Sequence, residues 1–110
     1  MKLKFGLPCS KIKDKIGDVE INCTSEEEAM AIAAGCILAG EKPTVYMQNS
    51  GFARSLDILT SLYLPYNIPF PKMILSLRHK PYHHGFIGNM THSLLRKLDY
   101  QNIEIVEQDI

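Results

Sequence analysis

The chain has 110 residues, enough for one domain with a single hydrophobic core and too few for two. Twelve basic side chains balance twelve acidic ones, so no net field favours nucleic acid or an anionic membrane surface. No apolar run reaches membrane-spanning length, and the first residues lack the pattern of a signal peptide. The three cysteines have spacings that fit neither a zinc site nor a redox pair. We therefore expect a globular cytoplasmic protein with free thiols, with no nucleic-acid or membrane partner and no metal site of its own.

Hydrophobic periodicity and turn residues predict strands that alternate with helices. In chain order we expect a strand over 3–7, a helix over 10–16, a strand over 19–23, a helix over 26–39, a strand over 44–48, a helix over 52–63, a strand over 72–77, a loop over 78–90, a helix from a Thr91 cap to 98, and a strand over 103–106. Such alternation is typical of an α/β fold, with a mostly parallel sheet flanked by helices in three layers.

The first turn of the helix predicted over 26–39 contains three consecutive acids, Glu26, Glu27 and Glu28. Ser25 is a good N-cap, and Glu28 stands three residues after it, as in a capping box. Acidic first turns are common and are usually solvated. The rest of this helix, however, is apolar on nearly its whole circumference, which is typical of a helix buried centrally or against a second chain. A carboxylate held where an apolar pocket meets a helix end can be tuned for proton transfer.

In a parallel sheet, ligands bind outside the carboxyl ends of the strands. Four segments follow predicted strands and should meet there: 6–10, 23–27, 48–51 and 78–84. They supply a Pro-Cys-Ser turn, a carboxylate at a helix start, an amide–hydroxyl–glycine turn, and an arginine followed by a histidine pair. This convergence predicts a binding site more strongly than any one of the motifs alone.

Three of these blocks resemble the pyrimidine-binding domain of the thiamine diphosphate-dependent decarboxylases, and above all the sulfopyruvate and phosphonopyruvate decarboxylases. The turn Phe5-Gly6-Leu7-Pro8-Cys9-Ser10 is similar to the family's Gly-x-Pro-Cys/Asp-Ser turn, and 26–35 is similar to its Glu-Gly-x-Ala-x-Ala-x-Ala-Ala-Gly helix. The segment Thr44-Val45-Tyr46-Met47-Gln48-Asn49-Ser50-Gly51 resembles its Val-Tyr-Met-Gln-Asn-Ser-Gly block and is the most specific of the three. The likeness covers nearly the whole chain and implies one pyrimidine-binding domain over residues 1–110.

The resemblance implies that Glu26 hydrogen-bonds N1′ of the cofactor's aminopyrimidine and so promotes loss of the thiazolium C2 proton. Glu27 and Glu28 are interpreted as solvated and capping residues. The family further implies that Pro8, Gln48, Asn49, Ser50 and Gly51 contact the cofactor, although 48–51 alone also fits a simple strand-to-helix turn capped by Asn49 or Ser50.

For the substrate, an anionic 2-oxoacid, the resemblance implies binding by Ser10, Asn49, Ser50, Arg78 and His84, with His84 also a proton donor. The neighbouring His83 leaves this alignment uncertain by one residue. Surface solvation is the alternative for Arg78, for Arg54 and for both histidines.

The chain lacks the Gly-Asp-Gly and Asn-Asn pattern with which the family holds magnesium and the diphosphate. The resemblance therefore implies a separate beta subunit that binds Mg²⁺ and the diphosphate, in a hetero-oligomer that shares thiamine diphosphate. It implies the alpha subunit of a decarboxylase acting on sulfopyruvate in coenzyme M synthesis, with phosphonopyruvate as the second substrate. The family's helix before the first strand has no counterpart, and the loop after Arg78 is shorter. These departures leave open a non-catalytic interaction domain that kept the fold.

Overall fold

The computed structural model describes residues 4–6, 21–23, 25–80 and 82–107. They form a parallel sheet of five strands in the order β2-β1-β3-β4-β5. The strands are β1 (Lys4–Gly6), β2 (Ile21–Asn22), β3 (Thr44–Gln48), β4 (Lys72–Leu77) and β5 (Ile103–Glu107). The predicted α/β fold with a mostly parallel sheet is confirmed, and β3 and β4 have the predicted bounds. The helix predicted over 10–16 lies outside the described residues.

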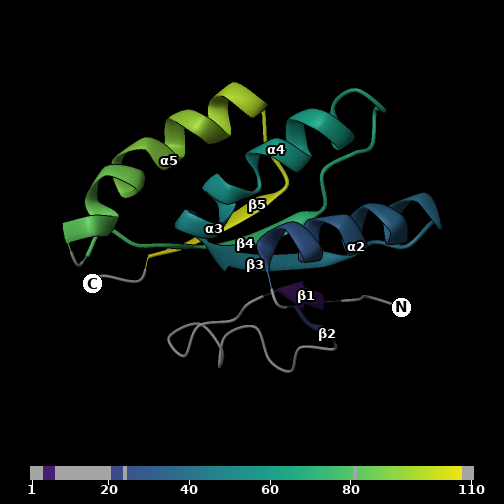
Figure 1. Ribbon diagram of the computed structural model, residues 1–110, viewed down its shortest axis with the longest axis horizontal. Helices are drawn as coiled ribbons and strands as arrows, with labels where there is room; N and C mark the ends of the chain where they lie inside the picture. Colours follow the sequence, from purple (N-terminus) through teal and green to yellow (C-terminus); the bar gives the residue numbers. More distant parts are fainter. Residues whose placement is uncertain (1–3, 7–20, 24, 81, 108–110) are drawn as a thin grey trace.

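The helices pack on one hydrophobic core, which also contains Val45 and Met47 of β3 and Met73 and Leu75 of β4. Figure 1 shows the helices gathered on one side of the sheet. They are α2 (Glu26–Leu38), α3 (Asn49–Arg54), α4 (Leu56–Ile58), the π-helical η1 (Leu59–Tyr63), the 3₁₀ turn η2 (Tyr82–His84) and α5 (Gly85–Leu98). Because all the strands run parallel, the starts of α2 and α3 and the end of β4 lie at the carboxyl edge of the sheet.

Helix α2 begins at Glu26 as predicted and ends at Leu38, one residue before the predicted end. The Ser25 hydroxyl accepts a hydrogen bond from the Glu28 backbone N–H at 3.1 Å, which confirms Ser25 as the N-cap. Past the C-terminus, Gly40 adopts a φ of 89°, and Glu41 N–H donates to the Cys36 carbonyl at 2.9 Å. A left-handed glycine of this kind closes many helices because it has no Cβ to clash.

The prediction of one continuous helix over 52–63 is wrong, because the helical region begins earlier and is divided into several segments. Helix α3 already begins at Asn49, and it ends at Arg54, where the Ser55 hydroxyl donates to the Gly51 carbonyl at 3.0 Å. A serine that bonds back four residues weakens and bends a helix. The chain then widens into a π-turn, in which Leu64 N–H donates to the Leu59 carbonyl at 3.0 Å.

The predictions of a loop over 78–90 and of a helix cap at Thr91 are also wrong, because a helix already begins within this range. Helix α5 begins at Gly85, so Thr91 lies in its interior, wholly buried, and its hydroxyl donates to the Ile87 carbonyl. Gly88 explains why the helix can start so early. A Cβ on Gly88 would lie 2.7 Å from the Arg78 carbonyl oxygen, so only glycine lets α5 approach the end of β4 this closely.

Candidate functional site

The first turn of α3 links the two sides of the candidate site. On one side Gly51 lies against the side chain of Glu26, the first residue of α2. On the other side Asn49 binds the backbone of Arg78 at the end of β4. The structure thus brings together three of the four segments that the sequence predicted to meet at the carboxyl edge of the sheet. Pro8 and Ser10, from the fourth segment, lie outside the described residues.

Glu26 has the features of a positioned but available carboxylate. A Cβ on Gly51 would lie 2.7 Å from the Glu26 carboxyl carbon, so the absence of a side chain at residue 51 makes the space in which this carboxylate lies. Glu26 is half-buried, whereas Glu27 and Glu28 are exposed, as predicted. Within the described part of the chain, no group donates a hydrogen bond to the Glu26 carboxylate. It can therefore accept a proton or a hydrogen bond from a ligand at the sheet edge.

Asn49 is used inside the protein. Its side chain is wholly buried, and its amide group donates to the Arg78 carbonyl at 3.0 Å and to the Thr91 hydroxyl at 3.3 Å. Its amide oxygen accepts a hydrogen bond from the Arg78 N–H at 3.0 Å. Both amide donors are occupied inside the protein, so this geometry fits a positioning function for Asn49, and its predicted contact with a ligand stays a prediction. Its side chain does not cap α3, whose N-cap is Gln48 without a side-chain hydrogen bond.

Gln48 and Ser50 flank Asn49 and are both half-buried. Gln48 ends β3, and Ser50 lies in the first turn of α3. Over the described ranges, neither side chain has a hydrogen-bond partner, so the Gln48 amide and the Ser50 hydroxyl keep their donors and acceptors for a ligand. Together with Glu26, they give the carboxyl edge one anionic and two neutral polar groups.

Arg78 and the histidine pair form the far side of the site. The Arg78 Nε donates to the Lys80 carbonyl at 3.1 Å, so the guanidinium folds over its own turn while its terminal nitrogens stay unbonded within the described residues. In η2, the rings of His83 and His84 lie 4.2 Å apart, with His83 exposed and His84 half-buried. The structure places both histidines directly before α5.

Sequence reasoning missed His79. Its imidazole ring packs on Gly88 of α5, immediately after Arg78. The signal in the sequence was a Gly-x-x-Gly pair at 85 and 88, which allows a helix to pass close to a neighbouring turn. His79 is thus a fourth polar group that the fold holds at the end of β4.

Within the described ranges, no three His, Cys, Asp or Glu residues are grouped closely enough to hold a metal ion. None of the helices found there is long and apolar enough to span a bilayer.

The chain matches curated proteins over part of its length. It is 40% identical over 70 residues, 57% of this chain, to the sulfopyruvate decarboxylase subunit alpha of Methanocaldococcus jannaschii. It is 37% identical over 79 residues to the subunit alpha of Methanothermobacter thermautotrophicus. The phosphonopyruvate decarboxylase of Streptomyces viridochromogenes is 33% identical over 108 residues, 87% of this chain. No family model matches the chain.

The chain spans less than half the length of these relatives: 41%, 47% and 27% of them, respectively. Their names agree with the resemblance that residues 5–10, 26–35 and 44–51 predicted. The chain is therefore a homologue of the sulfopyruvate and phosphonopyruvate decarboxylases, and the predicted relationship is confirmed.

Proposed function

We propose that this chain is the alpha subunit of a thiamine diphosphate-dependent decarboxylase that converts sulfopyruvate to sulfoacetaldehyde and carbon dioxide in coenzyme M synthesis. The observation that supports this most is the contact between Glu26 and Gly51. It brings the acidic start of α2 against the Gln-Asn-Ser-Gly turn, and both blocks belong to the motifs that resemble the family. If Glu26 were only a solvated acid, its side chain would not require a glycine at residue 51.

The residues at the carboxyl edge fit the aminopyrimidine half of the cofactor. Any side chain at residue 51 would fill the space in which the Glu26 carboxylate lies. No described residue donates a hydrogen bond to this carboxylate, so it can accept one from the ring. Gln48 and Ser50 add neutral donors and acceptors beside it. When bound, thiamine diphosphate supplies the electron sink that decarboxylation of a 2-oxoacid requires. Glu26 would hold the proton at N1′, and Gln48 and Ser50 would orient the ring.

The substrate's anionic group would lie toward Arg78. A guanidinium offers several N–H donors to a sulfonate or phosphonate, and the Asn49 clamp fixes the backbone from which it extends. His84 would donate a proton or a hydrogen bond on the same side. Phosphonopyruvate is kept as the second candidate substrate. The phosphonopyruvate decarboxylase match has the lower identity, 33% against 40%, but it covers more of this chain, 87% against 57%.

A separate beta subunit would bind Mg²⁺ and the diphosphate and complete the site in a cytoplasmic hetero-oligomer. Two relatives are named subunit alpha, which implies a second kind of subunit in those enzymes. This chain also exposes an apolar stripe over η2 and the start of α5, in the segment that follows Arg78 and contains His84: Tyr82 is 83%, Phe86 66% and Met90 54% exposed. We infer that the partner covers this stripe, because its burial would shield the site from water.

The test is to purify the chain with its partner and to assay carbon dioxide release from sulfopyruvate and from phosphonopyruvate. Glu26→Gln should lower kcat at least a hundredfold, the usual range for loss of a general acid–base group. Glu27→Gln, which changes the adjacent exposed carboxylate, should leave kcat unchanged. If Glu26→Gln kept full activity, the assigned mechanism would be wrong. If the complex did not bind thiamine diphosphate in a calorimeter, a non-catalytic interaction domain would be the better interpretation.

A further inference from the structure

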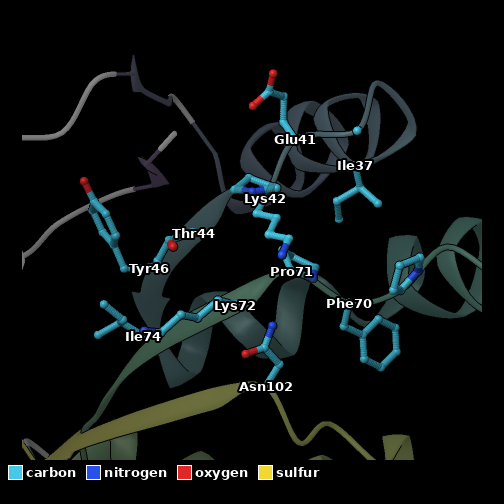
Figure 2. A pocket seen from close by; sticks show the side chains of 13 residues that line it. Ile37, Glu41, Lys42, Thr44, Tyr46, Phe70, Pro71, Lys72, Ile74 and Asn102 are labelled. Atoms are coloured by element: carbon cyan, nitrogen blue, oxygen red, sulfur yellow. The ribbon is translucent and has the colours of Figure 1, made fainter. Parts of the chain in front are cut away.

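A cavity lies at the opposite edge of the sheet from the candidate site. It has a volume of about 840 Å³ and opens at the amino ends of β3 and β4, where Thr44 and Lys72 begin these strands. The connection between α2 and β3 forms one side, and the proline-rich segment before β4 forms the other (Figure 2). A cavity of this size is within the range that holds small organic molecules.

The floor and walls of the cavity are mainly apolar. Ile37, Tyr46, Phe70 and Ile74 line it together with Pro43, Pro69 and Pro71. Phe70 is held in place by a stacked contact with Tyr100, with ring centroids 4.6 Å apart, and by an edge contact with Tyr63 at 5.8 Å. Prolines and a fixed ring make a wall that keeps its shape without a ligand, which lowers the entropic cost of binding one.

The polar lining of the cavity includes two lysines and one acid, Glu41. Lys42 and Lys72 lie at its margin, and neither has an ion-pair partner in the part of the chain that the structure describes. Figure 2 shows Lys42 extending toward Pro71 and the Glu41 carboxylate pointing away from both lysines. Asn102 adds an amide at the β5 side. An apolar cavity bordered by two unpaired ammonium groups is complementary to an amphipathic anion.

We propose that this cavity binds a small amphipathic anion, with an aromatic or alicyclic body against its apolar wall and one sulfonate, carboxylate or phosphate group at the margin that Lys42 and Lys72 border. This site is independent of the proposed decarboxylation at Glu26. It lies at the other edge of the sheet and shares no residue with the candidate site. A ligand here would therefore bind alongside the substrate without competing with it.

The experiment compares two fluorescent probes with one ring system, anilinonaphthalene sulfonate and its uncharged analogue phenylnaphthylamine, on the purified full chain. We expect one saturable site for the sulfonate and about tenfold weaker binding of the uncharged probe, because charge-assisted contacts to two lysines add about 1.4 kcal/mol. The double variant Lys42→Glu/Lys72→Glu should remove this tenfold preference. Lys97→Glu, on the exposed face of α5, is the matched charge control and should keep it.

Phe86→Ser serves as the apolar control, since the probe could otherwise bind the exposed stripe of α5. Circular dichroism checks that each variant stays folded. Loss of probe binding in Phe86→Ser, equal affinity of the two probes, or an unchanged preference in Lys42→Glu/Lys72→Glu would each overturn the proposal. Thiamine diphosphate binding and activity at Glu26 are measured separately, so failure at this cavity leaves the proposed function standing.

Discussion

At the scale of single residues, Gly51 is the position whose substitution best separates function from stability. Gly51→Ala places a Cβ where the Glu26 side chain now lies, 2.7 Å from its carboxyl carbon. The flexible carboxylate can move away, so the free energy of unfolding should change by no more than about 1 kcal/mol, helped by the better helix propensity of alanine. Activity of the complex should nevertheless fall at least tenfold, with a higher apparent KM for thiamine diphosphate.

Gly35→Ala is the matched control for this substitution. Gly35 lies in the interior of α2, it is exposed, and a Cβ there meets no atom within 4 Å. Alanine should stabilise the chain by about 1 kcal/mol in urea unfolding and leave decarboxylation unaltered. Equal losses of activity in Gly35→Ala and Gly51→Ala would show that the effect does not come from displacing Glu26.

Asn49 makes a second prediction at this scale. Asn49→Asp keeps the shape of the side chain but turns a carboxylate oxygen toward the Arg78 carbonyl, to which the amide now donates. The other oxygen would keep its hydrogen bond from the Arg78 N–H, but a buried charge with one oxygen facing a carbonyl still costs about 3 kcal/mol. Burial raises the pKa of such a carboxyl, so the folded state binds this proton more tightly than the unfolded chain does. The lost free energy of unfolding should therefore be recovered as the pH falls toward about 4.

Urea unfolding of Asn49→Asp at about pH 7 and pH 5 checks this prediction. Asn89→Asp, on the exposed part of α5, should stay within about 0.5 kcal/mol of the wild type at both values. A variant at residue 49 as stable as the wild type at neutral pH would contradict the positioning function.

The predicted site residues show what a sequence can and cannot supply. The proximity of Glu26 and Gly51 could be predicted, because each follows a strand of one parallel sheet. The hydrogen bonds of Asn49 could not be predicted, because its partners Arg78 and Thr91 are 29 and 42 residues away in the chain. Only the packing of α5 on the end of β4 shows that its amide is occupied.

At the scale of elements, the same contrast separates α2 from α3 and α5. Ser25 and Gly40 are local start and stop signals, and the bounds of α2 followed from them. Helix α5 begins with Gly85 and has a second glycine at 88, residues of low helix propensity that predicted a loop. It forms there because the missing Cβ at Gly88 permits close packing on Arg78 and His79. Tertiary contact outweighs local preference at this point.

Two buried tyrosines join elements and predict how stability depends on alkaline pH. The Tyr63 hydroxyl of η1 donates to the Met30 carbonyl of α2, and the Tyr100 hydroxyl donates to the Pro71 carbonyl before β4, each at 2.6 Å. Desolvation by burial raises the pKa of both phenols well above the ordinary value of 10.0. The folded state therefore keeps protons that the unfolded chain loses above pH 10.

The free energy of unfolding should thus be unaffected below about pH 10 and should fall above it by about 1.4 kcal/mol per pH unit for each tyrosine. Urea titrations between pH 9 and about pH 11 measure the slope. Tyr63→Phe should reduce it by one tyrosine's share, whereas Tyr66→Phe, at a side chain that is 72% exposed, should not. A slope that Tyr63→Phe leaves unchanged would show that Tyr63 titrates in the folded protein.

At the scale of the whole molecule, the exposed apolar residues at the start of α5 predict where the partner binds. Tyr82 and Phe86 pack edge to face, with ring centroids 6.0 Å apart, and Met90 continues the stripe one turn further along the helix. Because these residues adjoin Arg78 and the histidine pair, a subunit that covers them also encloses the proposed substrate side. Phe86→Ser/Met90→Ser should raise the dissociation constant of the complex at least tenfold, since burial of one such side chain contributes about 1.5–3 kcal/mol.

Sedimentation velocity of the mixed subunits measures this effect. Tyr66→Ser is the matched control, because it removes an equally exposed ring from the turn that precedes β4, at the amino edge of the sheet. It should leave the dissociation constant unchanged. Normal assembly of Phe86→Ser/Met90→Ser would move the expected interface to the exposed side of α2, where Leu38 is 74% accessible and Ala31 and Gly35 are also exposed. Carbon dioxide release should then follow assembly, because Glu26 lies on this chain while we propose that the other subunit holds the diphosphate.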